Sequence, residues 1–406
     1  MGNTPNIRFK GFTDDWEQRK LGDVVEDYVE KTTVEDQYPV LTSSQQKGIV
    51  LQDDYFSGER VSQNGNIGYF VIPRGYFTFR SRSDNDVFVF NRNDAVDMGI
   101  ISYFYPVFKP KGVNSDFLLR RLNYGLEDQI KINSEGTGQH VLSLKKFKNI
   151  VGVFPSYEEQ KKIGSYFSQI DHLITLHQRK CDEMKKMKKF MLQKMFPKNG
   201  QKNPEIRFDG FTDDWEQRKF SDYYKMSSGC AFKMSDYCED GIGLINGESI
   251  QHGIINDDNL NHLPESFIEQ YPDFILKEGD IVVGLNRPIT NGNLKIARIP
   301  SKYNDSLLYQ RAGKVVYKEE CDRDFSYVLL SQEILKHTLV EAVGSDQPFI
   351  STSKLDKWQM MIPKDIEEQH KIGEYFSNLD NLITLHQRKV DNLKNLKKYM
   401  LQNMFV

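Results

Sequence analysis

The side chains that could carry catalysis do not stand in the arrangements that catalysis needs. Residues 346–349, Asp-Gln-Pro-Phe, come within one residue of a methyl-transfer box, but Gln347 takes the place of its first proline and no cofactor loop accompanies it. We interpret this match as coincidence. Four acidic residues could imitate a nuclease centre, yet no acidic-x-Lys signature follows them, so we interpret them as loop residues: Asp84, Asp86, Asp94 and Asp97.

Nucleotide and metal chemistry have no clear support either. The chain has no GxxxxGK[ST] loop and no GxGxxG turn, which are the common cradles for ATP and dinucleotides. Its four cysteines form no CxxC pair, and we expect reduced thiols. His177 and His386 occupy matched places in two copies of one segment, and we interpret them as polar helix residues. The sequence therefore predicts no metal, no cofactor and no catalysis in this chain.

Composition indicates a folded, soluble protein with more than one domain. A chain of 406 residues exceeds one ordinary core, and no apolar run reaches the ~20 residues of a membrane helix. The first residues lack the order of a secretory signal, so we expect a cytoplasmic protein without membrane contact. The net charge of −3 argues against a nucleic-acid partner, but residues 157–202 hold 11 Lys and Arg against five Asp and Glu, so basic surface is local.

The elements that would position functional residues occur twice. Residues 5–20, PNIRFKGFTDDWEQRK, return at 204–219 with two changes, and residues 158–196 return closely at 367–405. The long middles show no comparable identity. Such a tandem repeat predicts two copies of one structural unit. The predicted parts are a first domain (1–156), a central helix (157–197), a linker (198–203), a second domain (204–365) and a C-terminal helix (366–406).

Each closing segment predicts one long helix, because proline is absent from 158–196 and apolar residues recur at spacings of four and three. Sustained 4/3 spacing is typical of a coiled-coil seam. The predicted seam residues are Ile163, Phe167, Ile170, Ile174, His177, Ile372, Phe376, Leu379, Ile383 and His386. We expect the two helices to pair antiparallel, with a flanking apolar stripe covered by the domains or by a partner protein. Ordinary core helices of one large domain are the alternative.

The middles predict a mixed α/β fold. Apolar runs at 69–73, 86–90, 101–108, 280–285 and 312–317 indicate strands, and residues 117–130 and 325–339 indicate one helix each. The junction between the halves contains a copy of the C-terminal sequence followed by a copy of the N-terminal sequence. This suggests a circular, pseudo-twofold arrangement with neighbouring termini. The whole is then two globular domains joined by two long antiparallel coiled-coil helices.

Two paired motifs make the chain resemble a known family. An EEQ-x-KI box opens each closing segment (158–163 and 367–372), and each domain ends in a G-x-x-Q-x-x-[LI]-S loop, GTGQHVLS (136–143) and GSDQPFIS (344–351). In these features the chain resembles the specificity subunit of a type I restriction-modification system. The resemblance covers essentially the whole chain.

The resemblance implies a non-catalytic subunit with two target-recognition domains, each reading one half of a bipartite site in double-stranded DNA. The helices would set the gap between half-sites and dock two methyltransferase subunits. Restriction subunits would complete the complex, and S-adenosylmethionine, ATP and Mg²⁺ would be bound by those partners.

Reading bases needs Arg or Lys for guanine and Asn or Gln for adenine. The candidates in the first domain are Gln45, Gln46, Lys47, Arg80, Arg82, Asn85, Gln139 and His140, and those in the second are Asn286, Arg287, Asn291, Asn293, Gln310, Arg311, Ser345 and Gln347. Phosphate contacts, which position without specifying, are expected from Lys145, Lys146, Lys148, Lys354 and Lys357.

Two other functions stay open on the sequence. A scaffold could join two protein-binding domains through the same helices, and salt-dependent binding to bipartite DNA would distinguish it from a DNA reader. A fused methyltransferase is the weaker alternative, because no cofactor loop is found.

Overall fold

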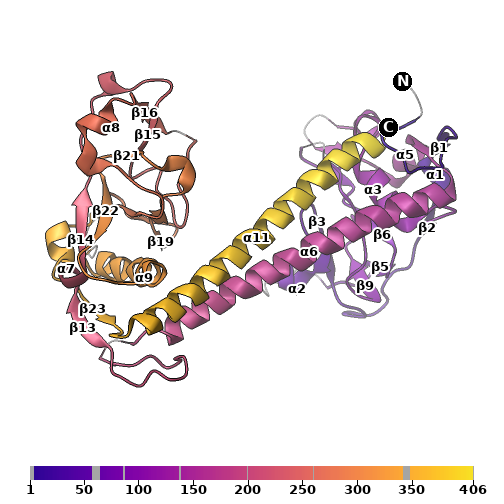
Figure 1. The fold of residues 1–406 in the computed structure, drawn as a ribbon. Helices are drawn as coiled ribbons and strands as arrows, with labels where there is room; N and C mark the ends of the chain where they lie inside the picture. Colours follow the sequence, from indigo (N-terminus) through magenta and orange to yellow (C-terminus); the bar gives the residue numbers. More distant parts are fainter. Residues whose placement is uncertain are drawn as a thin grey trace. The chain divides into compact units, whose positions relative to one another are not determined.

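The computed structural model describes residues 4–56, 65–85, 87–136, 139–198, 200–258, 260–341 and 348–405. The chain divides into two compact units (Figure 1). Unit 1 contains residues 1–179 and 386–406, and unit 2 contains residues 180–385. Each unit therefore takes part of both closing segments.

Both units are built on a four-stranded antiparallel sheet with the same topology. The strand order is β2-β10-β6-β8 in unit 1 and β14-β22-β17-β20 in unit 2. The bounds are β2 (Val25–Tyr28), β10 (Val107–Pro110), β6 (Phe77–Phe79), β8 (Phe90–Arg92), β14 (Tyr224–Ser228), β22 (Ala312–Tyr317), β17 (Ile281–Gly284) and β20 (Ile296–Arg298).

Smaller elements surround each sheet. In unit 1 they are β1 (Glu17–Lys20), α1 (Leu21–Val24), β3 (Leu41–Ser44), β4 (Gly48–Leu51), α2 (Gln52–Tyr55), β5 (Phe70–Pro73), β7 (Arg82–Ser83), β9 (Met98–Ile101), α3 (Ser115–Asn123), α4 (Glu127–Asn133), β11 (His140–Val141), α5 (Leu144–Asn149) and β12 (Val151–Phe154). In unit 2 they are β13 (Glu216–Lys219), α7 (Phe220–Tyr223), η1 (Met234–Asp236), β15 (Ile242–Ile245), β16 (Asn261–Leu263), α8 (Phe267–Gln270), η2 (Pro272–Phe274), β18 (Ile289–Thr290), β19 (Asn293–Leu294), η3 (Ser301–Tyr303), β21 (Leu307–Leu308), α9 (Arg323–Glu341), α10 (Thr352–Leu355) and β23 (Gln359–Ile362).

The core of unit 1 is largely aromatic. Phe147 of α5 lies with its ring centroid 5.2 Å from Phe79, 5.3 Å from Phe90 and 5.0 Å from Phe108, so it packs on three strands of the sheet. All four rings are almost completely buried. Because α5 directly follows the G-x-x-Q-x-x-[LI]-S loop, this packing fixes where the loop ends.

The structure confirms two long antiparallel helices, α6 (Tyr157–Lys194) and α11 (Ile366–Met404), of 38 and 39 residues. In unit 1 their contacts run in opposite directions along the two helices: Phe167 with Phe405, Asp171 with Lys397, and His177 with His386. Unit 2 shows the same trend, with Lys188 bound to Asp380 and Phe196 packed on Phe376. The ten predicted seam residues are all buried or half-buried.

The repeated start boxes clamp the beginnings of these helices. Arg8 makes a bidentate pair with Glu159, at 2.8 Å for both Nε–Oε1 and Nη2–Oε2. Arg207 binds Glu368 in the same way, at 2.7 and 2.8 Å. Both carboxylates are only 1% exposed. Bidentate charged pairs are strong and geometrically specific, which accounts for the presence of both partners in each copy.

The rest of the EEQ-x-KI box also serves packing. Gln160 donates from Nε2 to Pro155 O and accepts the Asn114 N–H, and Gln369 makes the equivalent pair of bonds. A Cβ on Gly164 would lie 2.6 Å from Asn114 Oδ1, and one on Gly373 would lie 2.5 Å from Asp322 Oδ1. Only glycine permits this close approach of the long helix to the start of α3 or α9.

The two ends of the chain meet inside unit 1, as the circular arrangement predicts. Ile7 N–H donates to Asn403 O at 2.8 Å, and in unit 2 Ile206 N–H donates to Lys194 O at 2.9 Å. Phe405 packs on Trp16 just as Phe196 packs on Trp215. The chain end in unit 1 thus makes the contacts that the linker region makes in unit 2.

Three local predictions are wrong. The strand predicted at 101–108 is the end of β9 and the start of β10, separated by a turn in which Tyr105 N–H donates to Ser102 O at 3.0 Å. Residues 117–130 form two helices, α3 and α4, because Gly125 adopts φ +79° between them and breaks the helix. The strand predicted at 86–90 is β8, which begins only at Phe90; Asp86 lies outside the described residues. In the described part of the chain, no helix is long and apolar enough to cross a membrane.

Candidate nucleic-acid interface

In unit 1, the chain leaving β6 carries several predicted base-reading residues. Ser81 N–H donates to Phe104 O at 3.1 Å, and Leu142 N–H donates to Ser81 O at 2.9 Å. β7 then pairs with β11, placing Arg82 opposite Val141 and Ser83 opposite His140. Residues 80–85, 102–105 and 139–142 thus form one short surface, which we call edge 1.

The side chains of edge 1 support one another. The guanidinium of Arg82 lies 5.1 Å from the centroid of the Phe104 ring, within cation–π range. Gln139 donates from Nε2 to Asp84 Oδ1 at 2.8 Å, and the Ser83 hydroxyl donates to Asn85 Oδ1 at 2.9 Å. Exposed amide and guanidinium groups held in this way can present donors and acceptors to a base edge.

The remaining first-domain candidates are also accessible. Arg80 is exposed beside Tyr105; burial raises the pKa of that tyrosine, and the Arg80 charge opposes the rise. The loop between β3 and β4 exposes Gln45, Gln46 and Lys47. Ser44 Oγ accepts the N–H groups of Gln46 and Lys47, each at 3.2 Å, so this loop has a defined backbone.

Unit 2 has the equivalent surface after β17. Leu285 N–H donates to Arg311 O at 3.0 Å, and Ile350 N–H donates to Leu285 O at 2.9 Å. Asn286 pairs opposite Phe349 in an isolated antiparallel bridge. Residues 285–287, 309–311 and 348–350 form edge 2, which shares with edge 1 two equivalent backbone hydrogen bonds and one pair of opposed residues, although the sequences differ.

Edge 2 carries four of the second-domain candidates. Arg287 adopts φ +46° and donates its N–H to Pro348 O at 3.1 Å, which leaves its side chain exposed. Asn286 is half-buried, and Arg311 is exposed. Gln310, also exposed, donates from Nε2 to the Tyr309 hydroxyl at 3.3 Å.

Asn291 and Asn293 lie on a hairpin between β18 and β19. Asn291 and Gly292 both have positive φ, +51° and +77°, the backbone that a two-residue type I′ turn requires. Both asparagines are exposed. Ser345 and Gln347, the last two candidates, lie outside the described residues, as do Asp346 and most of the loop around them.

The predicted phosphate ligands are not equivalent. Lys146 pairs with Glu135, Lys354 pairs with Glu341 at the matched position, and Lys148 binds Asp27 at 2.8 Å. A phosphate would have to compete with those carboxylates. Lys145 and Lys357 are exposed and show no ion pair in the part of the chain that the structure describes. These two are the better candidates.

Sequence reasoning missed the apolar members of both edges. Tyr103, Phe104 and Val141 are exposed at edge 1, and Phe349 is exposed at edge 2. Candidate selection by polar residue type could not find them. For Val141 and Phe349 the sequence contains a usable signal. Each is a large apolar residue in a polar, glycine-rich loop, directly before the [LI]-S end of the motif.

The residues that could imitate catalytic groups have ordinary partners. Asp97 binds Arg74 and Asp94 binds Arg92, each at 2.8 Å. His177 and His386 meet through their Nδ1 atoms at 2.9 Å inside the helix seam. Among the described residues, no group of three or more His, Cys, Asp or Glu side chains could hold a metal ion.

The flanking stripe of the long helices stays exposed among the described residues. Of the two covers expected for it, the domains and a partner protein, the domains therefore do not provide one. Unit 1 exposes Leu173, Leu176, Leu396 and Tyr399, and unit 2 exposes Met187, Phe190, Leu382 and Leu385 at the matched positions. In unit 1, Leu173, Leu393 and Leu396 line a hollow of about 320 Å³. Solvent-exposed apolar groups at matched positions are typical of a protein-binding surface.

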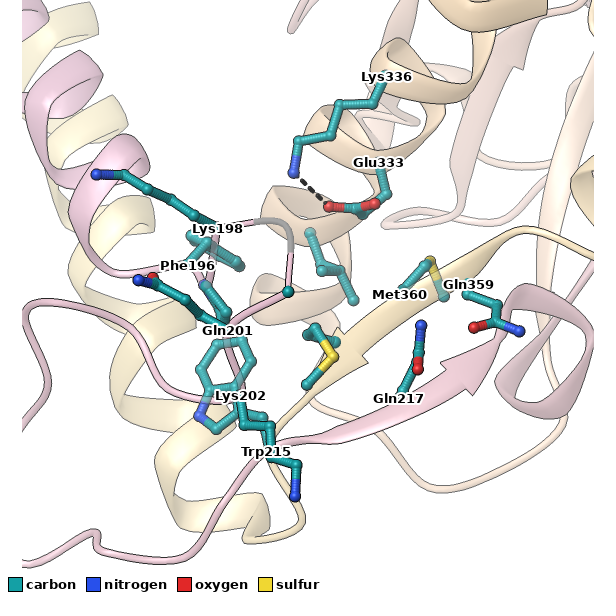
Figure 2. A pocket seen from close by; sticks show the side chains of 14 residues that line it. Phe196, Lys198, Gln201, Lys202, Trp215, Gln217, Glu333, Lys336, Gln359 and Met360 are labelled. Atoms are coloured by element: carbon teal, nitrogen blue, oxygen red, sulfur yellow. Dashed lines mark hydrogen bonds and ion pairs between the residues drawn. The ribbon is translucent and has the colours of Figure 1, made fainter.

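One hollow of unit 2 lies beside the linker and holds none of the predicted residues (Figure 2). Its volume is about 440 Å³, and Phe196, Trp215 and Met360 form part of its wall. Lys336, at its rim, pairs with Glu333 at 2.7 Å. Lys198 and Lys202 also line the hollow, and they pair with Glu205 and Asp214. With its lysines already paired, this hollow offers no evident site for an anion.

A comparison with protein families matches both halves of the chain. The family described as "Type I restriction modification DNA specificity domain" matches residues 13–186 and again residues 212–395. These two segments cover most of the chain and contain both edges.

Curated relatives agree with this match. Over 277 residues the chain is 33% identical to the type I restriction enzyme MjaVIII specificity subunit of Methanocaldococcus jannaschii, covering 67% of this chain and 65% of that protein. It is 30% identical over 171 residues to the type I restriction enzyme EcoAI specificity subunit of Escherichia coli, covering 42% of this chain and 28% of that protein. The chain thus spans less than two thirds of the length of either relative.

A solved structure shows the same fold. The type I restriction-modification system S subunit from M. genitalium superposes with a TM-score of 0.64, covering 99% of both chains at 12% sequence identity. Identity this low supports the fold alone.

Proposed function

Because this chain belongs to the type I restriction-modification DNA specificity family, we propose that it is the DNA-reading subunit of such a system and acts in the cytoplasm. In this proposal, the chain selects the sequence and catalyses nothing itself. S-adenosylmethionine, ATP and Mg²⁺ would be bound by its partner subunits.

One observation carries the proposal: edges 1 and 2 share their backbone arrangement but not their side chains. Edge 1 presents Arg82 and Gln139, and edge 2 presents Asn286, Arg287 and Arg311. Arginine suits guanine and asparagine or glutamine suits adenine. Equal frameworks with different donors and acceptors are what two half-sites of different sequence require.

The finer proposal concerns the helices. Two reading domains would engage a bipartite site, and the antiparallel pair α6 and α11 would fix the length of the unread gap. Half-sites read from one face of B-DNA lie about 34–36 Å apart, or a multiple of this. The exposed stripe, present at matched positions in both units, would dock one methyltransferase subunit per unit, and restriction subunits would join that complex.

Mapping methylated bases in the host genome, with and without the gene for this chain, tests the proposal. The expected result is one bipartite methylated motif with a constant gap that disappears when the gene is deleted. Binding to that duplex should weaken steeply with salt and should be lost when either half-site is scrambled. A genome whose methylation is unchanged by the deletion would refute the proposal.

A further inference from the structure

We propose that Val141 and Phe349 are specificity residues that contact the 5-methyl group of a thymine, one in each half-site. The inference rests on the proposed DNA-reading function. To the polar base contacts proposed for each edge, it adds one apolar contact.

The two residues occupy the same structural position. Val141 stands opposite Arg82 in the pair of β7 and β11, and Phe349 stands opposite Asn286. Each lies directly before the residue that donates its N–H to the first strand: Leu142 to Ser81, and Ile350 to Leu285, both at 2.9 Å. The position was therefore filled by an apolar residue in both copies, although the surrounding loops differ.

Both side chains face solvent from a fixed backbone. Val141 is 38% exposed and Phe349 is 59% exposed, while the next residue in each loop, Leu142 or Ile350, is almost completely buried. Val141 N–H donates to Glu135 O at 2.7 Å, and its carbonyl accepts the Glu135 N–H at 3.0 Å. Hydrogen bonds from Arg287 and Ile350 hold the residues on either side of Phe349. Folding does not bury these side chains, yet their backbone is ordered.

Their neighbours identify the ligand. In an antiparallel pair, directly opposite side chains lie on the same face about 4.5–5.5 Å apart at Cβ. Val141 is thus next to Arg82, and Phe349 is next to Asn286. Arginine reads guanine, asparagine reads adenine, and an apolar side chain reads the thymine methyl, all in the major groove. Each edge therefore offers one polar and one apolar reader side by side. A protein-docking surface would not need a guanine or adenine reader beside each apolar residue.

The test replaces single thymines by deoxyuridine, which removes only the methyl group, in the mapped bipartite duplex. Affinity is measured for the full chain assembled with its modification subunits. At one thymine in each half-site, the wild type should lose about fourfold in affinity, the effect of one buried methyl group. Val141→Ala should abolish this sensitivity in one half-site only, and Phe349→Ala in the other. Phe349→Leu should retain it.

Two controls separate the possible failures. Val29→Ala and Met234→Ala remove exposed apolar side chains outside the edges and should leave both affinity and deoxyuridine sensitivity unchanged. If the wild type does not prefer the mapped duplex over a scrambled one, the proposed function itself fails. If it does prefer that duplex but no thymine is sensitive, or if both alanine variants stay sensitive, only the methyl-reading inference is refuted.

Discussion

At the scale of single residues, two buried carboxylates fix the framework. Glu159 and Glu368 are almost inaccessible, and each is neutralised by one arginine of a start box. Hydrogen bonding to the carboxylate raises the pKa of Arg8 and of Arg207, so both guanidinium groups stay charged. Trp215 also donates from Nε1 to Glu368 at 3.3 Å.

Arg207→Ala should therefore destabilise unit 2 strongly, because it removes the cation that neutralises the buried Glu368 carboxylate. We expect a loss of about 3–5 kcal/mol in the free energy of unfolding, measured by urea denaturation. Lys364→Ala, which breaks an exposed pair with Glu216, is the matched control and should cost less than about 1 kcal/mol. Equal small losses in both variants would contradict the assigned role of the pair.

Base and phosphate ligands should differ in their effects on DNA binding. Arg287→Ala should relax sequence preference at one base pair by about 1–3 kcal/mol, whereas Lys145→Ala should weaken binding to all sequences and lower the salt slope by about 1. Lys145 is the sharper choice than Lys146, whose ammonium pairs with Glu135. Salt titrations with matched and mismatched duplexes measure both effects, and identical behaviour of the two variants would remove the distinction.

One of the two differences between the start boxes has a matching change elsewhere. Asn6 donates from Nδ2 to Asn403 Oδ1 at 3.4 Å, while at the corresponding places Glu205 binds Lys194. Hydrogen bonds from Lys194 and Lys198 lower the pKa of Glu205 to about 2.

Because the folded-state pKa of Glu205 lies below its usual value of 4.5, its stabilising contribution is present above that pH and is lost as the pH falls toward 2. Lys194→Asn, which installs the residue found at the matched position, should raise the Glu205 pKa. Carboxyl NMR titration of the two proteins measures the change. An unaltered pKa in the variant would contradict the assigned cause.

At the scale of elements, the sequence predicts best where pattern and burial coincide. The 4/3 spacing predicts α6 and α11 within three residues at each end, and the apolar runs predict β17 and β22. The break at Gly125 was missed, since a glycine within an apolar pattern can also be tolerated in a helix. The edges could not be predicted, because the pairing of Arg82 with Val141 depends on a contact between segments far apart in the chain.

If the helices measure the gap between half-sites, lengthening them should lengthen the gap. Inserting one heptad after Lys180 and one after Lys389, which occupy matched positions, preserves the seam register and adds about 10.5 Å. The preferred gap should grow by about three base pairs, as measured by methylation mapping. Insertions of three residues at the same two places break the heptad register of the seam and serve as controls. An unchanged gap with intact methylation would exclude the helices as the ruler.

At the scale of the whole molecule, the two chain ends make in unit 1 the contacts that the segments flanking the linker make in unit 2. Ile7 and Asn403 make the backbone bond that Ile206 and Lys194 make. The same packing should therefore form if the two chain ends are joined and the chain is opened in the linker instead.

A circular permutant tests this. Residue 405 is joined to residue 4 through a copy of 197–203, and the chain is opened within 198–203. The permutant should fold, and its free energy of unfolding should stay within about 1 kcal/mol of the parent, since exposed connections tolerate new termini. Opening the chain inside β22 instead should abolish folding. A permutant that fails to fold would show that the native ends are required.

The matched clamps Arg8–Glu159 and Arg207–Glu368 also have a combinatorial consequence. In each unit, the globular domain is attached to a long helix through the same bidentate arginine–glutamate pair. If each domain reads one half-site, as proposed, n domains attached through this pair would specify n × n ordered pairs of half-sites. Exchanging one domain would then change one half of the recognised DNA sequence and leave the helices unaltered.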